Sequence, residues 1–509
     1  MVAHRMTVAL DALQTRLGEV SDLESVASGL GWDQQVMMPP GGAALRAEAM
    51  ATLETLTHER FASDEVGRLL DEAAAEPDAP EDSFAASLLR VTRRDWDKAR
   101  RVPGELKAEL ARTTAIAYEA WADARRRSDW EAFKPHLGKV LELRRRYAEC
   151  FPEAACAYDA LLDDFEPGMT SVEVSRVFAQ LRDGLVPLIA EVARVADRVD
   201  DSPLHGDFPV ERQERLVRRA AEGLGFDSHS WRLDPTVHPF ATGYGTQDVR
   251  ITTRYEPGFL PAALFGTLHE TGHGLYESGS DPSLDRTPLA GGVSLGLHES
   301  QSRLWENFVG RGRPFSGWLL EQIRHEFPRE FAEVDIDRYY PAVNRVAPSL
   351  IRVEADEATY SLHVIIRFEL EQDMLEGRVS LDDLPEAWNA KYAEYLGLEV
   401  PDAAQGILQD VHWSGGAIGY FPTYALGNVM AGQIWDVART ALPDLDHDLS
   451  NGETRHLRGW LTERLYRHGR TRTPRETLAH ATGGTGELDP GPYLAYLREK
   501  LGAVYGLSG

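Results

Sequence analysis

The segment T-L-H-E-T-G-H-G-L-Y at residues 267–276 constrains this chain more than any other part of its sequence. In a helix, His269 and His273 lie one turn apart on the same face. Two imidazoles at that separation can share a small cation such as zinc, and Glu270 beside them is close enough to accept a proton from a water on the metal. The flanking sequence supports a helix with an apolar stripe, formed by Leu264, Leu268 and Leu275. We therefore predict a metal-binding helix; the alternative is that both histidines make only ordinary polar contacts.

The rest of the chain has the composition of a large helical body. Of its 509 residues, 43% are hydrophobic and 27% are charged, which supplies ample material for a core. Helical periodicity recurs along the chain, for example at residues 7–20, 171–199 and 210–224. Residues 32–42, which include two prolines and two glycines, are predicted to form a turn or loop. Because no repeat or low-complexity linker divides the chain, we predict one domain spanning residues 1–509.

The charge and hydropathy of the chain narrow its possible partners. A net charge of −27 repels phosphate backbones, which argues against duplex nucleic acid as a partner. No apolar run approaches the length of a membrane span, and the N-terminal residues lack the apolar core of a signal peptide. Only two cysteines are present, Cys150 and Cys156, too few for a secreted disulfide scaffold. We expect a soluble cytoplasmic protein that binds neither membranes nor nucleic acid.

A strand is predicted immediately before the metal-binding helix. In residues 248–255, Val249, Ile251, Thr253 and Tyr255 alternate with polar residues, which is the period of a β-strand. If its edge is free, such a strand offers backbone groups to an extended peptide, with Asp248, Arg250 and Thr252 on one face. The alternative is a surface hairpin with a charged outer face.

A catalytic zinc site needs a third protein ligand and an open position for water. Residues 289–309 are predicted to form a second helix, with His298 and Glu299 near its middle. The intervening length allows one loop and a helix that crosses the first. Spacing alone does not choose Glu299 over Glu277 or Glu306, and it does not exclude His298 as a nitrogen donor.

Five sequence blocks extend over some 165 residues of the chain. They are D-x-R-x-T at residues 248–252, H-E-x-x-H at 269–273, H-E-S at 298–300, I-R-x-x-A-D at 351–356 and G-x-x-Q-D-x-H-W at 406–413. In type and order these blocks resemble the carboxypeptidase Taq family of metallocarboxypeptidases. Trp32-Asp33 and Met38-Pro39 also resemble the family's N-terminal region, so the resemblance extends over the whole chain.

The resemblance implies a fold, a cofactor and a ligand set. The family is similar in fold to other largely helical zinc peptidases of the neurolysin-like zincin type. This implies a mostly α, single large helical body with a deep active-site cleft and a small β element beside the metal helix. It also implies that Glu299 is the third ligand of a Zn²⁺ held by His269 and His273, that Co²⁺ can substitute for zinc, and that the protein is a homodimer.

The remaining blocks supply candidates for binding a substrate. A carboxypeptidase must hold a terminal carboxylate, and a guanidinium does so with two charge-assisted hydrogen bonds. Arg352 and Arg250 are the candidates, although each can instead form a structural salt bridge. Arg352 and Asp356 are four residues apart on a helix predicted to begin near Ser349, so they can pair or face one groove. His412 is predicted to bond the substrate near the scissile carbonyl, or else to pack beside the site.

Related helical zinc peptidases place a tyrosine hydroxyl against the developing oxyanion, and here Tyr420 is preferred to Tyr424. Either tyrosine can instead be a core aromatic with a satisfied hydroxyl. In the predicted reaction, Glu270 takes a proton from the zinc-activated water and gives it to the leaving amine, which releases one C-terminal amino acid from a peptide with a free C-terminus. Two alternatives remain: a zinc endopeptidase or dipeptidyl peptidase of the same helical class, and a non-catalytic helical scaffold that binds peptides.

Overall fold

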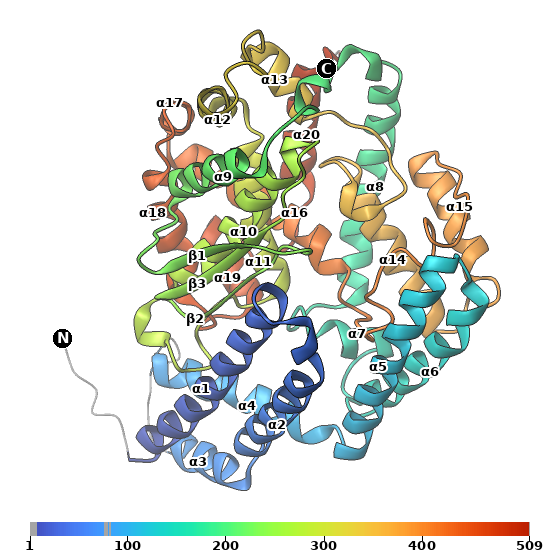
Figure 1. Cartoon of the computed structure of the whole chain (residues 1–509). Helices are drawn as coiled ribbons and strands as arrows, with labels where there is room; N and C mark the ends of the chain where they lie inside the picture. Colours follow the sequence, from blue (N-terminus) through green and yellow to red (C-terminus); the bar gives the residue numbers. More distant parts are fainter. Residues whose placement is uncertain (1–7, 76–79, 81–82, 508–509) are drawn as a thin grey trace.

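Helices make up most of the computed structural model, which describes residues 8–75, 80 and 83–507 (Figure 1). The N-terminal third is formed by α1 (Val8–Val36), α2 (Ala43–Phe61), α3 (Asp64–Ala74), α4 (Phe84–Arg101), α5 (Gly104–Arg127) and α6 (Trp130–Ala148). These are followed by α7 (Ala157–Leu162), α8 (Ser171–Ala193) and α9 (Val210–Leu224). The predicted helix at residues 210–224 therefore has the bounds that the sequence indicated.

The first helix is longer than its apolar periodicity predicts. It continues through Trp32 to Val36, and only then do Pro39 and a short 3₁₀ turn (Pro40–Gly42) redirect the chain. The prediction that the segment from Trp32 onward is a loop is thus wrong for its first five residues. Trp32 is held on the helix because its indole packs beneath the guanidinium groups of Arg232 and Arg250, whose centres lie 4.9 and 4.6 Å from the ring.

A three-stranded sheet lies left of the centre of the view in Figure 1, in the order β1-β3-β2. Its strands are β1 (Trp231–Pro235), β2 (Ala241–Gly245) and β3 (Asp248–Thr253). The predicted strand is β3, which pairs parallel with β1 and antiparallel with β2. Because β3 is the central strand, the expectation that it offers a free edge to a peptide is wrong. The alternative is right in one respect, because β2 and β3 are consecutive antiparallel strands and so form a hairpin. Its surface position is wrong, because Val249 and Ile251 are fully buried.

The predicted metal-binding helix is α10 (Leu260–Gly279), with Pro261 in its first turn. It packs on the sheet at Gly274, where an added Cβ would lie 2.3 Å from the Trp231 ring and 3.0 Å from Val249. A side chain at this position would therefore push α10 away from β1 and β3. The sheet fixes the depth at which the helix lies in the molecule.

The second predicted helix is shorter than expected and changes its winding. Ser294 caps α11 (Leu295–Arg303), its Oγ accepting the N–H of Leu297 at 3.2 Å. A π-helical segment (Leu304–Gly310) follows directly. The prediction that helix begins at residue 289 is wrong, because residues 289–294 form an irregular connection.

The C-terminal half packs around α10 and α11. It contains α12 (Arg313–Glu326), α13 (Ile336–Val343), α14 (Tyr360–Leu375), α15 (Leu384–Leu396), α16 (Pro422–Ala441), α17 (Leu445–Ser450), α18 (Arg455–Arg464), α19 (Pro474–Thr482) and α20 (Gly491–Tyr505). One extended hydrophobic core runs through these helices, α5 to α9 and the sheet. The predicted fold class, a mostly α body with a small β element beside the metal helix, is confirmed. None of the helices in the described ranges is both long and apolar enough to cross a membrane.

Candidate active site

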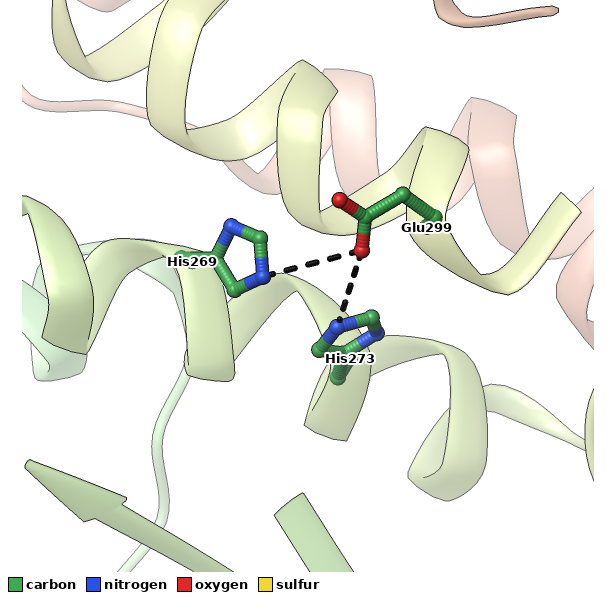
Figure 2. Close-up of side chains that lie close together, drawn as sticks. All are labelled: His269, His273 and Glu299. Atoms are coloured by element: carbon green, nitrogen blue, oxygen red, sulfur yellow. Dashed lines mark ion pairs between the residues drawn. The ribbon is translucent and has the colours of Figure 1, made fainter. Parts of the chain in front are cut away.

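His269 and His273 point from α10 toward Glu299 on α11, as Figure 2 shows. Glu299 Oε2 lies 3.7 Å from His269 Nε2 and 3.5 Å from His273 Nε2. One ligand atom from each residue falls within 4.8 Å of the others, which is the spacing of donors around a single ion. Two imidazole nitrogens and one carboxylate oxygen suit zinc and similar divalent metals, so these three residues fit the metal that the resemblance implies.

Two glycines let the helices approach closely enough to form this cluster. At Gly272, between the two histidines, an added Cβ would lie 2.6 Å from the carbonyl oxygen of Gln301 and 2.7 Å from the Cα of Ser302 on α11. At Gly427 on α16, it would lie 2.7 Å from the Cγ of Glu299. All three distances are shorter than van der Waals contact, so the third ligand, Glu299, is positioned by two close helix crossings.

The other two candidate ligands, Glu306 and Glu277, lie around the cluster rather than in it. Glu306 Oε2 is 2.9 Å from His269 Nδ1, which leaves Nε2 of that ring facing Glu299. Glu277 Oε1 is 2.6 Å from His298 Nε2. The ring of His298 in turn stacks on His273, with centroids 4.5 Å apart. His298 is therefore a ring neighbour that supports His273.

Burial and charge set the protonation of the cluster. Burial lowers the pKa of His273 to about 3, which keeps the imidazole in the neutral form that binds metals. Burial would raise the pKa of Glu299, but the positive charges of Arg303 and His269 outweigh it and hold this pKa well below its usual range. Glu299 is therefore a carboxylate, and Arg303 Nε binds its Oε1 at 2.7 Å.

Glu270 differs from Glu299 in its electrostatic surroundings. Its side chain is buried on α10, and the structure gives it no arginine partner among the described residues. Burial, with the charge of Glu299 adding to it, raises the pKa of Glu270 to about 7. A carboxyl group with a pKa near neutrality is suited to accept and return a proton.

Arg250 is enclosed by partners at the face of the sheet turned toward α1. Its Nε and Nη2 bind the two oxygens of Asp248 at 2.9 and 3.0 Å. Its guanidinium lies 4.6 Å from the ring centres of both Trp32 and Tyr244. Thr252, the third polar residue of this strand, binds the backbone N–H and C=O of Phe240. Arg250 thus forms a structural salt bridge with Asp248, which was the alternative to binding a substrate carboxylate.

Arg352 does not lie on the predicted helix. The chain is irregular from Ser349, forms one 3₁₀ turn (Arg352–Glu354) and becomes helical only at Tyr360. Arg352 does not pair with Asp356, which was one of the two options, because the carboxylate of Asp356 binds the backbone N–H groups of residues 347, 358 and 359. These local hydrogen bonds favour a turn over a helix.

The carboxylate that binds Arg352 is Asp410, which the sequence motif contained but our site prediction did not include. Nε and Nη2 of Arg352 are both 2.9 Å from Asp410 Oδ1. The other oxygen, Oδ2, is 2.6 Å from Nε of Arg367 on α14. Two buried arginines therefore share one carboxylate, and this group of three side chains carries an excess of positive charge.

Tyr360 connects this arginine pair to the metal ligands. Its hydroxyl accepts a hydrogen bond from Nη1 of Arg352 at 3.0 Å. Its ring lies 4.2 Å beneath the guanidinium of Arg303, which binds Glu299. Sequence reasoning missed Tyr360, Arg303 and Arg367, because no local spacing relates them to the two histidines.

His412, Tyr420 and Tyr424 lie together near these groups. His412 Nε2 is 3.2 Å from the Tyr424 hydroxyl, and the rings of Tyr420 and Tyr424 are 5.3 Å apart. Burial raises the pKa of Tyr420, with the negative charge of Glu299 as the next cause. Burial also lowers the pKa of His412 to about 4, which keeps it neutral. The hydroxyl of Tyr424 contacts both His412 and the side chain of Tyr420.

The helical fold and this histidine–carboxylate cluster are those of a metal-dependent peptide hydrolase. A family model described as carboxypeptidase Taq (M32) metallopeptidase matches residues 12–501. The chain belongs to this family and is a metallocarboxypeptidase, which releases single amino acids from the C-terminus of peptides. The endopeptidase, dipeptidyl-peptidase and scaffold alternatives gain no support.

Three similar proteins illustrate the relationship. The chain is 41% identical to thermostable carboxypeptidase 1 of Thermus thermophilus over 498 residues, covering 96% of this chain and 97% of that protein. It is 37% identical to carboxypeptidase 1 of Bacillus subtilis over 490 residues, covering 96% and 97% of the two chains. A crystal structure of the M32 carboxypeptidase from Deinococcus radiodurans R1 superposes with a TM-score of 0.96 at 42% identity, covering 98% of this chain and 100% of that one.

Proposed function

We propose that His269, His273 and Glu299 hold a Zn²⁺ ion, with Co²⁺ as a possible substitute. The convergence of their ligand atoms within 4.8 Å is the observation that carries this proposal. When bound, the ion supplies a Lewis acid that lowers the pKa of a water and polarises a carbonyl. Glu306 orients His269 by its 2.9 Å contact with Nδ1, and Arg303 orients Glu299.

Glu270 is the proton carrier in this proposal. It accepts a proton from the attacking water and delivers it to the nitrogen of the leaving amino acid. In the ion-free protein, burial raises its pKa to about 7. Tyr420 donates its hydroxyl hydrogen bond to the oxygen of the scissile carbonyl as negative charge develops there. The charge of Glu299 acts on this phenol and on that of its neighbour Tyr424.

Arg352 binds the terminal carboxylate of the substrate. The arginine pair at Asp410 has one positive charge more than it has carboxylates, and a substrate carboxylate would balance it. His412, neutral and hydrogen-bonded to Tyr424, contacts the peptide beside the carbonyl. Arg250 remains a second candidate for the carboxylate, but its guanidinium already binds both oxygens of Asp248.

Substrates are peptides with a free C-terminus, bound in a cleft beside α10. The decisive experiment combines metal analysis with amino-acid release from one peptide in free-acid and amidated forms. We expect one zinc per chain, release of the last residue from the free acid and no cleavage of the amide. Cleavage of both forms would indicate an endopeptidase, and absence of stoichiometric metal together with absence of cleavage would indicate a scaffold.

A single domain, a cytoplasmic location and a homodimer complete this proposal. The match of one family model to residues 12–501 supports a single domain over the whole chain. The free thiols of Cys150 and Cys156 support a reducing, cytoplasmic location. The homodimer is proposed from the family resemblance, and light scattering of the purified protein measures it directly.

A further inference from the structure

Glu371 is a buried acid that the proposed reaction does not use. It lies on α14 with 0% of its surface exposed. No lysine, arginine or histidine forms an ion pair with it in the described part of the chain. A buried carboxyl group without a cation costs free energy unless hydrogen bonds replace its water, so its partners show what it does there.

Three donors converge on this carboxyl group. The indole Nε1 of Trp413 donates to Oε1 at 2.9 Å. The hydroxyl of Tyr158, on α7, donates to Oε2 at 2.8 Å, and the backbone N–H of Gly419 donates to the same oxygen at 3.1 Å. Burial raises the pKa of Glu371 to about 7, although these donors act in the opposite direction. Both oxygens are thus used as acceptors.

Two of these donors belong to one irregular segment, which we call the site loop (residues 401–421). It contains no helix or strand and joins α15 to α16. Trp413 is the neighbour of His412, and Gly419 is the neighbour of Tyr420. The contacts of Glu371 therefore fall directly beside two residues proposed to meet the substrate.

The same face of α14 binds the site loop at a further point. Arg367, one turn before Glu371, binds Asp410 at 2.6 Å. At the other end of the loop, Gly419 has a φ of 90° and lies so close to α7 that an added Cβ would be 2.9 Å from the N atom of Leu162. The site loop is thus fastened between α14 and α7. Glu371 on α14 binds the loop at Trp413 and Gly419, and it binds α7 at Tyr158.

We infer that Glu371 is a positioning residue, which holds the site loop through Trp413 and Gly419 in the shape that presents His412 and Tyr420 to the substrate. This inference rests on the proposed function for the roles of those two residues. Glu371, on α14, thus determines the positions of His412 and Tyr420, although His412 lies 41 residues later in the sequence and Tyr420 further still.

Glu371→Gln changes this group with almost no change in volume. An amide has one oxygen acceptor and one NH₂ donor. If its oxygen faces Trp413, its NH₂ faces the N–H of Gly419; if its oxygen faces Gly419, its NH₂ faces the indole N–H. In either orientation the amide NH₂ faces another N–H donor, which is unfavourable. The site loop must therefore shift at Trp413 or at Gly419.

The activity test compares Glu371→Gln with a control on the same helix. Glu369→Gln alters a part-buried glutamate whose partners are Lys391 and Tyr395, away from the site loop. We expect Glu371→Gln to lower kcat/KM for a free-acid peptide by about tenfold or more, while zinc content stays at the wild-type value, because one lost hydrogen bond to a charged group corresponds to such a factor. Glu369→Gln should leave kcat/KM unchanged. A wild-type kcat/KM in Glu371→Gln would overturn the inference.

A double-mutant cycle separates positioning from general destabilisation. If Glu371 acts through His412, Glu371→Gln should lower kcat/KM much less in a His412→Ala background than in the wild type. Equal losses in the wild type, in the His412→Ala background and in a Tyr420→Phe background would show that Glu371 acts on the whole fold, and they would refute the inference. A His412→Ala variant with wild-type kinetics would refute it too.

Fluorescence gives a readout that does not depend on catalysis. The emission of Trp413 is obtained by subtracting the spectrum of Trp413→Phe from that of the wild type, and the same subtraction is made in the Glu371→Gln background. We expect this difference spectrum to shift in Glu371→Gln, because the indole N–H then faces an amide oxygen or an amide NH₂ in place of the carboxyl oxygen. If the wild-type enzyme releases no amino acid, the proposed function fails. The difference spectrum still tests whether Glu371 holds the site loop at Trp413. An unchanged difference spectrum rejects the inference.

Discussion

Gly272 of α10 lies against Ser302 of α11, with room for no side chain between them: an added Cβ would be 2.7 Å from the Ser302 Cα. Gly272 lies between His269 and His273 on α10, and Ser302 lies three residues after Glu299 on α11. The distance between the two helix backbones therefore sets the geometry of the metal cluster.

Gly272→Ala is predicted to weaken metal binding. Alanine favours the helix itself, but the added methyl group forces α10 and α11 apart, an overpacking that costs about 1–3 kcal/mol. We expect the dissociation constant for zinc, measured with a competing chelator, to rise by about tenfold or more. The control is Gly266→Ala on the same helix, where an added Cβ meets no atom within 4 Å. Equal zinc affinities in the two variants would contradict the prediction.

Glu270→Gln is predicted to separate metal binding from turnover. The amide keeps the shape of the buried side chain but cannot accept a proton, so kcat should fall by a factor on the order of 10²–10⁴. Zinc content should stay at one ion per chain, because the three ligand atoms belong to other residues. A kcat near the wild-type value would remove Glu270 from the reaction.

Arg352→Ala is predicted to raise KM for free-acid peptides with a smaller effect on folding. Asp410 keeps Arg367 as its partner at 2.6 Å, so this variant leaves no unpaired buried carboxylate. Loss of a charge-assisted contact to the substrate corresponds to an increase in KM of about 10- to 100-fold. The matched variant is Arg250→Ala, which should leave KM within about twofold because Arg250 is committed to Asp248. The opposite pattern would transfer the carboxylate to Arg250.

Glu166→Gln is predicted to flatten the dependence of stability on pH. Burial raises the pKa of Glu166 to about 7 from its ordinary 4.5, although the N–H of Gly296 and the hydroxyl of Ser294 act against it. Between these values the folded protein retains a proton that the unfolded chain releases, so the contribution of Glu166 to stability is present below pH 4.5 and lost as the pH rises through 7. The loss is of the order of 3 kcal/mol.

Denaturant unfolding at several pH values between 4.5 and 8 measures this effect. The free energy of unfolding of the wild type should fall more steeply with rising pH than that of Glu166→Gln. Parallel curves for the two proteins would show that Glu166 does not titrate in this range.

The sequence predicts best those parts of the chain whose contacts are local. The helix Val210–Leu224 follows from apolar residues at helical spacing, and the strand Asp248–Thr253 follows from apolar residues at alternate positions. In both elements most of the apolar side chains are buried. The H-E-x-x-H spacing placed both histidines on one helical face. The resemblance to a known family supplied Glu299, which no period or spacing selects.

The errors arise where distant groups decide the local conformation. The helix predicted near Ser349 fails because Asp356 satisfies backbone N–H groups in a turn. The free strand edge fails because β1, before β3 in the sequence, pairs with it. Trp32 is helical because two arginines some 200 residues later clamp its ring. Such pairings depend on the folded arrangement and leave no signal in the surrounding residues.

The excess positive charge at Asp410 has a consequence for how a peptide reaches the enzyme. The chain as a whole carries a net charge of −27, so an acidic peptide is repelled over the distance that salt leaves unscreened, about 10 Å at 0.1 M. Once inside, its terminal carboxylate meets two guanidinium groups that share one counter-ion and are shielded from the solution. Added salt should therefore raise the association rate of acidic peptides while changing the strength of the bound complex much less. The enzyme then discriminates among peptides by charge during their association and not once they are bound.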